Sequence, residues 1–368
     1  MNNKRLNNLR VKMADQDMQG VALVPGPNMG YFSGIHAHLS ERPIVLFVPA
    51  DDEPLIIIPT LEAMKARAAG ISNDRILDWS DQEWFEGAFE AAAAKLALSN
   101  WTLGVESLYM RVLESQQLLK SAPGLEIVPV DSAISALRGI KDNDELATME
   151  HAVAVAEKAM AALLPRIRAG MTELQIASML TQELSNAGAE TVAFGPIVAS
   201  GPNSAIPHAV PTERIVQEGD LLLFDWGAYV DGYASDITRT YAVGEIDPQL
   251  KEIYESVRLA NEAGKQAVRP DAEAQEVDRA ARRVIEDAGY GDLFIHRTGH
   301  GLGLEVHEEP SLVEGNRSRL QIGNTFTVEP GIYLEGCGGV RIEDDVLVTA
   351  DGHRSLTSLP RELISVGI

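Results

Sequence analysis

Four acidic residues and one histidine in the second half of the chain could together bind metal ions. They are Asp225, Asp236, His300, Glu329 and Glu343. This oxygen-rich set suits Mn²⁺, Fe²⁺ or Co²⁺ and can accept Zn²⁺, whereas the absence of thiolates disfavours a structural zinc site. Four negative charges would balance two divalent ions. A single structural Ca²⁺ or Mg²⁺ site is the alternative, but a histidine ligand fits it poorly.

The first two acids flank a predicted hairpin turn. Asp231-Gly232 is a strong signal for a two-residue type I′ turn between two β-rich runs. This turn would pair Asp225 with Thr238 and place Asp225 and Asp236 on one face, roughly 7–8 Å apart at the backbone. Two unpaired carboxylates on a buried face would be costly, so we expect cations there. The alternative is a solvent-exposed face on which both acids are ordinary surface charge.

His300 is expected on a loop or at a strand end. His296 and His300 are four residues apart, a spacing that on a helix suggests a zinc pair. The glycines at 299, 301 and 303 disfavour a helix, and the general-base glutamate of the H-E-x-x-H motif is missing. We therefore expect one imidazole, that of His300, to face a metal.

Glu329 and Glu343 lie in two strand-like runs, residues 325–333 and 340–348, joined by the glycine-rich turn EGCGG. This second hairpin would supply two more carboxylates. Two metals roughly 3.5–4 Å apart can lower the pKa of a bridging water, polarise a carbonyl and hold the attacking hydroxide. The five residues therefore predict amide hydrolysis.

Two domains are expected to position these residues. Residues 1–131 alternate short β-rich runs with amphipathic helices and predict an α/β domain, and residues 132–141 would form a linker. Residues 142–368 would form the catalytic domain, opening with a long helix from an acidic N-cap at Asp142 to about Arg168. Further helices are expected at 172–187, 248–268 and 272–289, with a β-rich region at 191–243.

The composition excludes several other classes of protein. The 368 residues carry a formal charge of −23, and no long block of Lys or Arg is present, which argues against binding to nucleic acid or an anionic membrane. The single cysteine, Cys337, allows no intramolecular disulfide and favours the cytoplasm. The N-terminus lacks the apolar region of a secretory signal, and no apolar run approaches a membrane span.

At these five residues the chain resembles the M24-type metallopeptidases, whose catalytic domain has the pita-bread fold. It is most similar to their proline-peptidase branch, prolidase (Xaa-Pro dipeptidase) and aminopeptidase P. The resemblance covers essentially the whole chain, because that branch carries a creatinase-like N-terminal α/β domain, which methionine aminopeptidases usually lack. It implies an α/β (α+β) fold, cleavage of Xaa-Pro peptide bonds, a homodimer and two divalent ions per subunit, Mn²⁺ first, with Co²⁺, Zn²⁺ or Fe²⁺ as alternatives.

The resemblance also implies a role for each ligand. Asp225 would bind one metal, Asp236 and Glu343 would bridge the pair, and His300 and Glu329 would complete the second. Glu329 would in addition act as the general base that moves the proton of the bridging water.

Other residues match positions around the metals in that family. His208, in SGPNSAIPHAVPT, matches a substrate-binding histidine that assists the tetrahedral intermediate, although a histidine in such a loop taken alone is more often simply exposed. His307, in LEVHEEP, matches a histidine near the scissile carbonyl and the proline pocket. Arg341 matches an arginine that orients metal-bound carboxylates, and Thr238 could play a similar part.

The sequence indicates less clearly whether the substrate is a dipeptide or a longer peptide. Arg297 lies where one prolidase subgroup binds the free carboxylate of an Xaa-Pro dipeptide, and His38 lies in a loop that, in prolidases of similar length, reaches the partner's active site. His38 and Ser40 differ from the acid and histidine of that subgroup. This departure argues against strict dipeptidase activity, so an Xaa-Pro dipeptidase is favoured only slightly over aminopeptidase P.

Two further alternatives stay open at this point. Creatinase-like hydrolases share both domains but work without metal and lack this ligand set. Outside enzymes, the same fold serves as a binding module in certain chaperone proteins that have lost the ligands.

Overall fold

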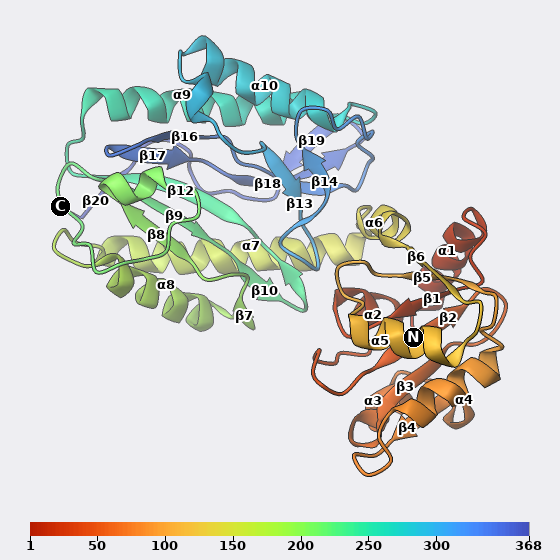
Figure 1. The fold of residues 1–368 in the computed structure, drawn as a ribbon. Helices are drawn as coiled ribbons and strands as arrows, with labels where there is room; N and C mark the ends of the chain where they lie inside the picture. The colour runs from red at the N-terminus through yellow and green to blue at the C-terminus, as the bar shows by residue number, and fades with distance from the viewer. Residues whose placement is uncertain (368) are drawn as a thin grey trace. The chain divides into compact units, whose positions relative to one another are not determined.

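The computed structural model describes residues 1–367 and divides the chain into two compact units, Met1–Arg138 and Gly139–Ile368 (Figure 1). The boundary falls inside the segment 132–141, which the sequence suggested as a linker. Most of this segment is helical, because α6 (Asp131–Arg138) buries Ala133 and Ile134.

The N-terminal unit is built on a six-stranded mixed sheet in the order β4-β3-β2-β1-β5-β6. β1 runs antiparallel to β2 and parallel to β5. The strands are β1 (Gly20–Leu23), β2 (Val45–Pro49), β3 (Leu55–Pro59), β4 (Ile76–Trp79), β5 (Thr102–Val105) and β6 (Glu126–Pro129). The other helices are α1 (Asn3–Ala14), α2 (Pro27–Ser33), α3 (Ala63–Ala68), α4 (Glu86–Leu96) and α5 (Val112–Ser121).

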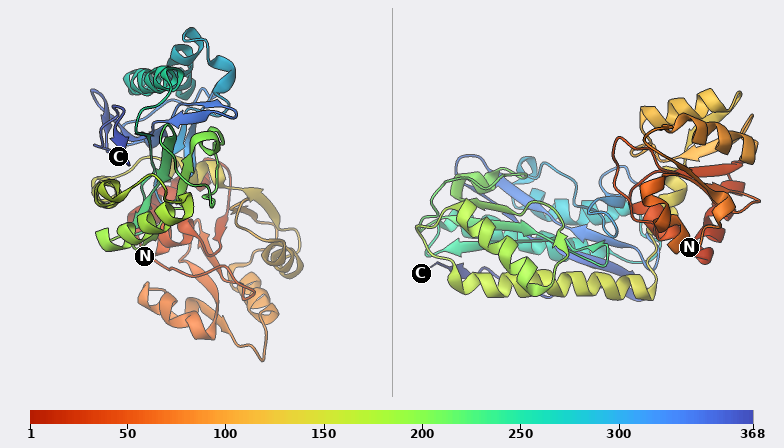
Figure 2. Two further views of the ribbon diagram at one scale, coloured as in Figure 1. Left: turned by 90° about the vertical axis from the view of Figure 1, so that its left-hand side faces the viewer. Right: turned by 90° about the horizontal axis from the view of Figure 1, so that it is seen from below.

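Two helix pairs enclose the strands of the C-terminal unit. α7 (Asn143–Leu163) and α8 (Glu173–Ala187) lie on one side, and α9 (Pro248–Ala267) and α10 (Ala274–Asp287) lie on the other (Figure 1). The right-hand view of Figure 2 shows α8 crossing in front of the strands. Each pair packs its apolar residues against strand residues in a separate core cluster.

Two larger sheets of this unit carry Asp225, Thr238 and His300. One has the order β20-β12-β9-β8, with β8 (Ile197–Ser200), β9 (Leu221–Trp226), β12 (Ile237–Val243) and β20 (Ser365–Val366). The other has the order β14-β13-β15-β18-β19, with β13 (Gly299–Gly301), β14 (Glu308–Leu312), β15 (Thr325–Val328), β18 (Asp344–Thr349) and β19 (Gly352–Ser355). Smaller sheets contain β7 (Thr191–Val192), β10 (Ala228–Val230) and β11 (Tyr233–Ala234), and β16 (Gly331–Leu334) and β17 (Gly338–Arg341).

The start of α7 follows from its sequence. Asp142 accepts hydrogen bonds from the N–H groups of Asp144 and Glu145, and the Glu145 side chain accepts one from Asp142 N, which completes a capping box. The helix ends at Leu163, before the expected Arg168. Pro165 lies in a following 3₁₀ turn, because proline has no N–H for the α-helical ladder.

The hairpin predicted from Asp231-Gly232 is present, and its register is confirmed. Asp225 pairs with Thr238 on neighbouring antiparallel strands. The ladder is interrupted near Gly227, where a Cβ atom would lie 1.9 Å from Ser235 O. Only glycine permits this close backbone approach.

The second predicted hairpin divides into two pairs of strands. β15 pairs with β18 in the five-stranded sheet, whereas β16 and β17 form a sheet of their own. One break falls at Glu329-Pro330 and the other at Ile342-Glu343. No helix within residues 1–367 is long and apolar enough to cross a membrane.

Candidate metal centre

The five candidate ligands converge from five separate positions in the C-terminal unit. Asp225 lies in β9 and His300 in β13, while Asp236, Glu329 and Glu343 lie just outside strands. Asp236, His300 and Glu343 each offer a ligand atom within 4.8 Å of the others. His300 Nε2 lies 3.2 Å from Glu329 Oε1 and 3.7 Å from Asp236 Oδ2.

Backbone hydrogen bonds from outside the regular ladder fix the three acids that lie outside strands. Glu329 N donates to Thr298 O at 2.7 Å, and Glu343 N donates to Thr238 O at 3.1 Å. Asp236 N donates to Asp345 Oδ2 at 3.2 Å. Because the strands are interrupted at these residues, their side chains do not have to follow the alternating directions of a regular strand.

Glycines on either side of His300 allow its strand to lie close to its neighbours. A Cβ atom on Gly299 would lie 1.9 Å from Thr327 O, and one on Gly301 would lie 2.2 Å from Glu309 O. His300 N donates to Thr327 Oγ1 at 3.2 Å. The glycines that made a helix unlikely in the sequence thus have a packing role in a strand.

The carboxylates are crowded and buried, which raises the pKa of three of them. Burial is the largest cause at Asp225, Asp236 and Glu343, and repulsion by neighbouring carboxylates adds to it. The buried Oδ1 atoms of Asp225 and Asp236 have no hydrogen-bond partner among residues 1–367. Crowded carboxyl oxygens beside a histidine nitrogen fit a divalent cation, whose charge would favour their ionised form.

Glu329 behaves differently from the other acids. Burial by itself raises the pKa of its carboxyl, but the hydrogen bond and electrostatic interaction with His300, with smaller contributions from His296 and Arg341, outweigh it and lower the pKa to about 2. Thr327 Oγ1 also donates to Glu329 Oε1, at 3.3 Å. Glu329 is therefore an anion at neutral pH.

Arg341 connects Asp225 to three other groups. Its Nη2 donates to Asp225 Oδ2 at 2.6 Å, and its Nε donates to Thr238 Oγ1 at 3.1 Å. Its Nη1 donates to the Tyr333 hydroxyl at 2.9 Å and to Pro207 O at 3.1 Å. A guanidinium has enough N–H groups in a fixed plane to hold all four.

Thr238 joins a second candidate ligand to this arrangement. Its hydroxyl donates to Glu343 Oε2 at 2.6 Å and accepts the hydrogen bond from Arg341 Nε. One hydroxyl thus lies between two groups that contact candidate ligands. This geometry suits the orienting role expected for both residues.

The two remaining catalytic candidates are exposed side chains. The His307 ring lies 4.2 Å from the His300 ring, centroid to centroid, at 75°. Partial burial, followed by the charges of His300 and Arg297, lowers the pKa of His307 to about 4. His208 directly follows Pro207, whose carbonyl Arg341 binds.

Tyr333 and His296 extend the contacts of Arg341, and neither was predicted to belong to the site. The Tyr333 hydroxyl lies 2.8 Å from His296 Nε2, and His296 Nδ1 lies 2.7 Å from Arg297 O. A carbonyl oxygen only accepts, so Nδ1 carries the proton and Tyr333 donates to Nε2. From the sequence, His296 was notable only for its spacing from His300, and nothing singled out Tyr333.

Two side chains of α10 hold the segment that leads into β13. Asp278 Oδ1 accepts from Thr298 N at 3.2 Å and from Thr298 Oγ1 at 2.7 Å. Arg282 donates to the carbonyl oxygens of Phe294 and His296, each at 2.8 Å, and pairs with Asp278. The spacing of Asp278 and Arg282, four residues apart on a helix, predicts an ion pair from the sequence. Such pairs are usually solvent-exposed, so the spacing does not indicate that they belong to a site.

The residues expected to set peptide length lie in different units. Arg297 Nη1 donates to Ser311 Oγ at 3.2 Å, and within residues 1–367 no carboxylate pairs with Arg297. His38 is exposed in the N-terminal unit, between α2 and β2.

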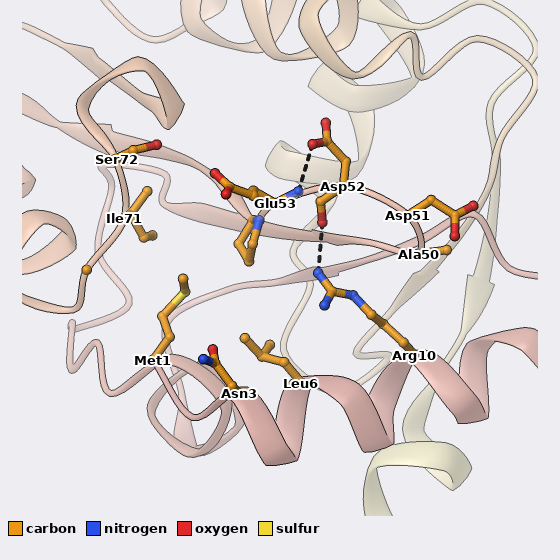
Figure 3. A pocket seen from close by; sticks show the side chains of 12 residues that line it. Met1, Asn3, Leu6, Arg10, Ala50, Asp51, Asp52, Glu53, Ile71 and Ser72 are labelled. Atoms are coloured by element: carbon orange, nitrogen blue, oxygen red, sulfur yellow. Dashed lines mark hydrogen bonds between the residues drawn. The ribbon is translucent and has the colours of Figure 1, made fainter.

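A surface cavity of about 620 Å³ in the N-terminal unit contains none of the predicted site residues. It lies between α1 and the turn joining β2 to β3, where Arg10 Nη2 donates to Asp52 O at 2.8 Å (Figure 3).

Two family models together match almost the whole chain. The model of metallopeptidase family M24 matches residues 147–350, and that of the creatinase/prolidase N-terminal domain matches residues 5–140. The chain belongs to metallopeptidase family M24. The expected fold, a creatinase-type α/β domain followed by an M24 catalytic domain, and the expected metallopeptidase class are thereby confirmed.

Known M24 proteins resemble the chain over nearly its full length. An Xaa-Pro dipeptidase from Lactobacillus delbrueckii subsp. lactis is 38% identical, over 93% of this chain and 94% of that protein. The structure of a prolidase from Thermococcus sibiricus is 36% identical, with a TM-score of 0.93 and 100% of both chains covered. That of an X-Pro aminopeptidase from Thermotoga maritima is 30% identical, with a TM-score of 0.86, and covers 98% of this chain and 99% of the other.

Proposed function

We propose that this protein is an Xaa-Pro dipeptidase that depends on two divalent metal ions. The observation that carries the proposal is the convergence of ligand atoms of Asp236, His300 and Glu343 within 4.8 Å of one another. Beside them lie the Oδ1 atoms of Asp225 and Asp236, which have no hydrogen-bond partner within residues 1–367. The name of the Lactobacillus relative supports proline as the second residue of the substrate.

The five residues would hold the ions as the resemblance implies, with Asp236 and Glu343 shared between them. Two bound ions, Mn²⁺ in the first place, would supply an acidified water and an electrophile for the scissile carbonyl. Glu329 would accept the proton of the water at Oε2, because its Oε1 faces His300 Nε2. Although burial raises the pKa of Glu329, the hydrogen bond with His300 lowers it overall and favours the anionic carboxylate that this role needs.

Neutral imidazoles would bind the reacting carbonyl. With a pKa of about 4, His307 is neutral at physiological pH and can donate one N–H hydrogen bond to the developing oxyanion. His208 would approach from the loop whose Pro207 carbonyl is held by Arg341. Both histidines are exposed, as groups that meet a substrate must be.

Arg297 would select dipeptides. Its guanidinium has no carboxylate partner within residues 1–367, which supports a charge kept for the free C-terminal carboxylate of Xaa-Pro. Aminopeptidase P is the second candidate, because His38 and Ser40 depart from the loop of the prolidase subgroup that uses such an arginine.

The test is hydrolysis in Mn²⁺-supplemented buffer of an Xaa-Pro dipeptide and of Xaa-Pro-Xaa tripeptides with the same first residue. We expect higher kcat/KM for the dipeptide. Cleavage of the tripeptides with the dipeptide spared would make the protein an aminopeptidase P. Absence of both bound metal and cleavage would favour a non-catalytic binding module.

We further propose that the enzyme works as a homodimer in the cytoplasm. The single cysteine supports a reducing compartment, and the family resemblance supports the dimer. Light scattering on the purified protein tests the dimer, since a monomer at micromolar concentration would contradict it.

A further inference from the structure

A buried carboxylate outside the metal centre holds the two ends of the loop that carries His208. Glu173, the first residue of α8, is fully buried. Its Oε1 accepts from Ser200 N at 2.7 Å and Ser200 Oγ at 2.8 Å. Its Oε2 accepts from Thr212 N at 3.0 Å and Thr212 Oγ1 at 2.7 Å. Asn203 Nδ2 donates to both oxygens, at 3.2 and 3.1 Å.

Local charge favours an anion at this position. Glu173 lies in the first turn of α8, where the helix dipole stabilises negative charge. Arg214 lies close by, since it donates to Ser200 Oγ at 2.5 Å and pairs with Asp220. A buried carboxylate is costly unless it is hydrogen-bonded, and here both oxygens are used fully.

The clamped segment, residues 200–212, is anchored near the metal centre as well. Ser204 Oγ accepts a hydrogen bond from Gly339 N at 2.8 Å, and Pro207 O accepts one from Arg341 Nη1 at 3.1 Å. His208 follows Pro207 directly and is exposed. Its place therefore depends on these two contacts at the tip of the loop. At the base it depends on the Glu173 carboxylate, together with the pairing of Ser200 in β8 and a hydrogen bond of 3.1 Å from Leu174 N to Thr212 O.

We infer that Glu173 is a positioning residue for His208. By binding Ser200 and Thr212 with one rigid carboxylate, it fixes the separation of the loop ends and so the direction in which His208 faces the substrate. The inference rests on the proposed function only for the role of His208. Glu173 itself touches neither the substrate nor a candidate ligand.

Glu173→Gln is the informative variant, because it keeps the volume but replaces one acceptor oxygen with an NH₂ group that faces donors. One end of the clamp is then lost. We expect kcat/KM for the Xaa-Pro dipeptide to fall about tenfold to a hundredfold, as for other small displacements of catalytic groups. Bound metal should stay unchanged. Glu183→Gln, on the same helix, is the matched control and should keep wild-type activity, since Glu183 contacts only Arg166 and Asn186 among the described residues, both exposed and far from the loop in sequence.

A double-mutant cycle separates positioning from general structural damage. In a His208→Ala background, Glu173→Gln should lower kcat/KM by no more than about twofold, because its effect passes through the missing histidine. An undiminished loss in that background, or an activity of Glu173→Gln equal to wild type, would overturn the inference.

Hydrogen exchange gives a readout that does not need activity. In Glu173→Gln the amide at the end that loses its acceptor, Ser200 or Thr212, should exchange faster, while the amides of β9 keep their protection. If this variant fails to fold, Thr212→Val removes one donor and should show the same local effect more weakly. Unchanged exchange at both amides refutes the clamp. If the wild type cleaves no Xaa-Pro peptide, the proposed function is refuted. The exchange experiment still tests the clamp in that case, because it does not depend on activity.

Discussion

Arg341 and Asp225 form a one-sided ion pair: Nη2 binds Oδ2 at 2.6 Å, whereas the buried Oδ1 has no hydrogen-bond partner among the described residues. The arginine thus fixes the rotation of the carboxylate and leaves its other oxygen for a cation. Because the same guanidinium also binds Thr238, Tyr333 and Pro207 O, its loss should affect the metal centre and the His208 loop together.

Arg341→Lys should retain the charge but lose the geometry, since an ammonium cannot hold four acceptors in a plane. We expect metal affinity to fall about tenfold to a hundredfold. Metal content after dialysis against graded chelator and kcat/KM measure the effect. Arg279→Lys, at an exposed pair with Glu314, is the control, and equal behaviour of the two variants would contradict the role.

Asp236→Asn should melt at a higher temperature than wild type when metal is absent and at a lower temperature than wild type when metal is present. Without metal, the variant should melt above wild type, because it removes one of several buried, mutually repelling carboxylates. With Mn²⁺ at a hundred times its dissociation constant, wild type should gain about 2.7 kcal/mol and melt higher, whereas the variant should gain little and be inactive. Thermal denaturation in chelator and in Mn²⁺ checks this, with Asp351→Asn as an exposed control. The same ranking in both buffers would contradict a shared metal site.

Arg297→Met should discriminate between the two peptide lengths. If the guanidinium binds the carboxylate of Xaa-Pro, KM for the dipeptide should rise at least about tenfold, in line with about 1.5–3 kcal/mol for a hydrogen bond to a charged group. Tripeptide cleavage should change less, because its carboxylate lies one residue further along. Equal losses on both substrates would assign Arg297 to the fold and not to selectivity.

Lys141 and Glu308 should be strongly coupled in stability. Their side chains are only 2% and 6% exposed, Nζ lies 3.1 Å from Oε2, and Glu308 is the neighbour of His307. Lys141→Met should cost about 3–5 kcal/mol by leaving a buried charge. Adding Glu308→Gln to Lys141→Met should restore part of that loss. Urea denaturation of the four proteins measures the coupling, and strictly additive effects would refute it.

Glu106 should make the N-terminal unit less stable as pH rises. Burial raises the pKa of its carboxyl to about 7, against the hydrogen bonds from Asn28 and Val24 N, so the folded state binds a proton more tightly than the unfolded state. The extra stability is complete below about pH 4.5 and is lost as pH rises through about 7, a change of about 3 kcal/mol. Glu106→Gln stays neutral and should lack this loss. Urea midpoints between about pH 5 and pH 8 test it, and parallel curves for both proteins would contradict it.

Local signals in the sequence predicted the first hairpin correctly. The Asp231-Gly232 turn and the period-two alternation fix the register without help from the rest of the chain, so Asp225 opposite Thr238 could be read directly. The acidic N-cap at Asp142 likewise marked the start of α7.

The division of the second hairpin could not be read from sequence. Residues 325–333 and 340–348 look like two continuous strands, but β15 and β18 join a sheet with β13, and β16 and β17 pair alone. Pairing with a strand some 25 positions earlier in the chain leaves no local trace. For this reason the strand breaks at Glu329 and Glu343 could be found only from the structure.

Buried charges outside the motifs were the other omission. Glu173, Asp278 and Lys141 look like ordinary polar residues in the sequence, yet each is buried with a specific partner. Whether a charge is solvated or buried depends on contacts from distant segments, such as Ser200 and Thr212 for Glu173.

The glycines beside His300 have a consequence for how this protein can vary. Gly299 and Gly301 carry no chemistry, yet any side chain there would overlap the backbone oxygens of Thr327 and Glu309. In a saturation library scored for activity, both positions should therefore be as intolerant as the ligand between them. A lack of tolerated substitutions at these two positions would reflect the close spacing of the strands. If the two glycines were taken for catalytic residues, the active site would be overestimated.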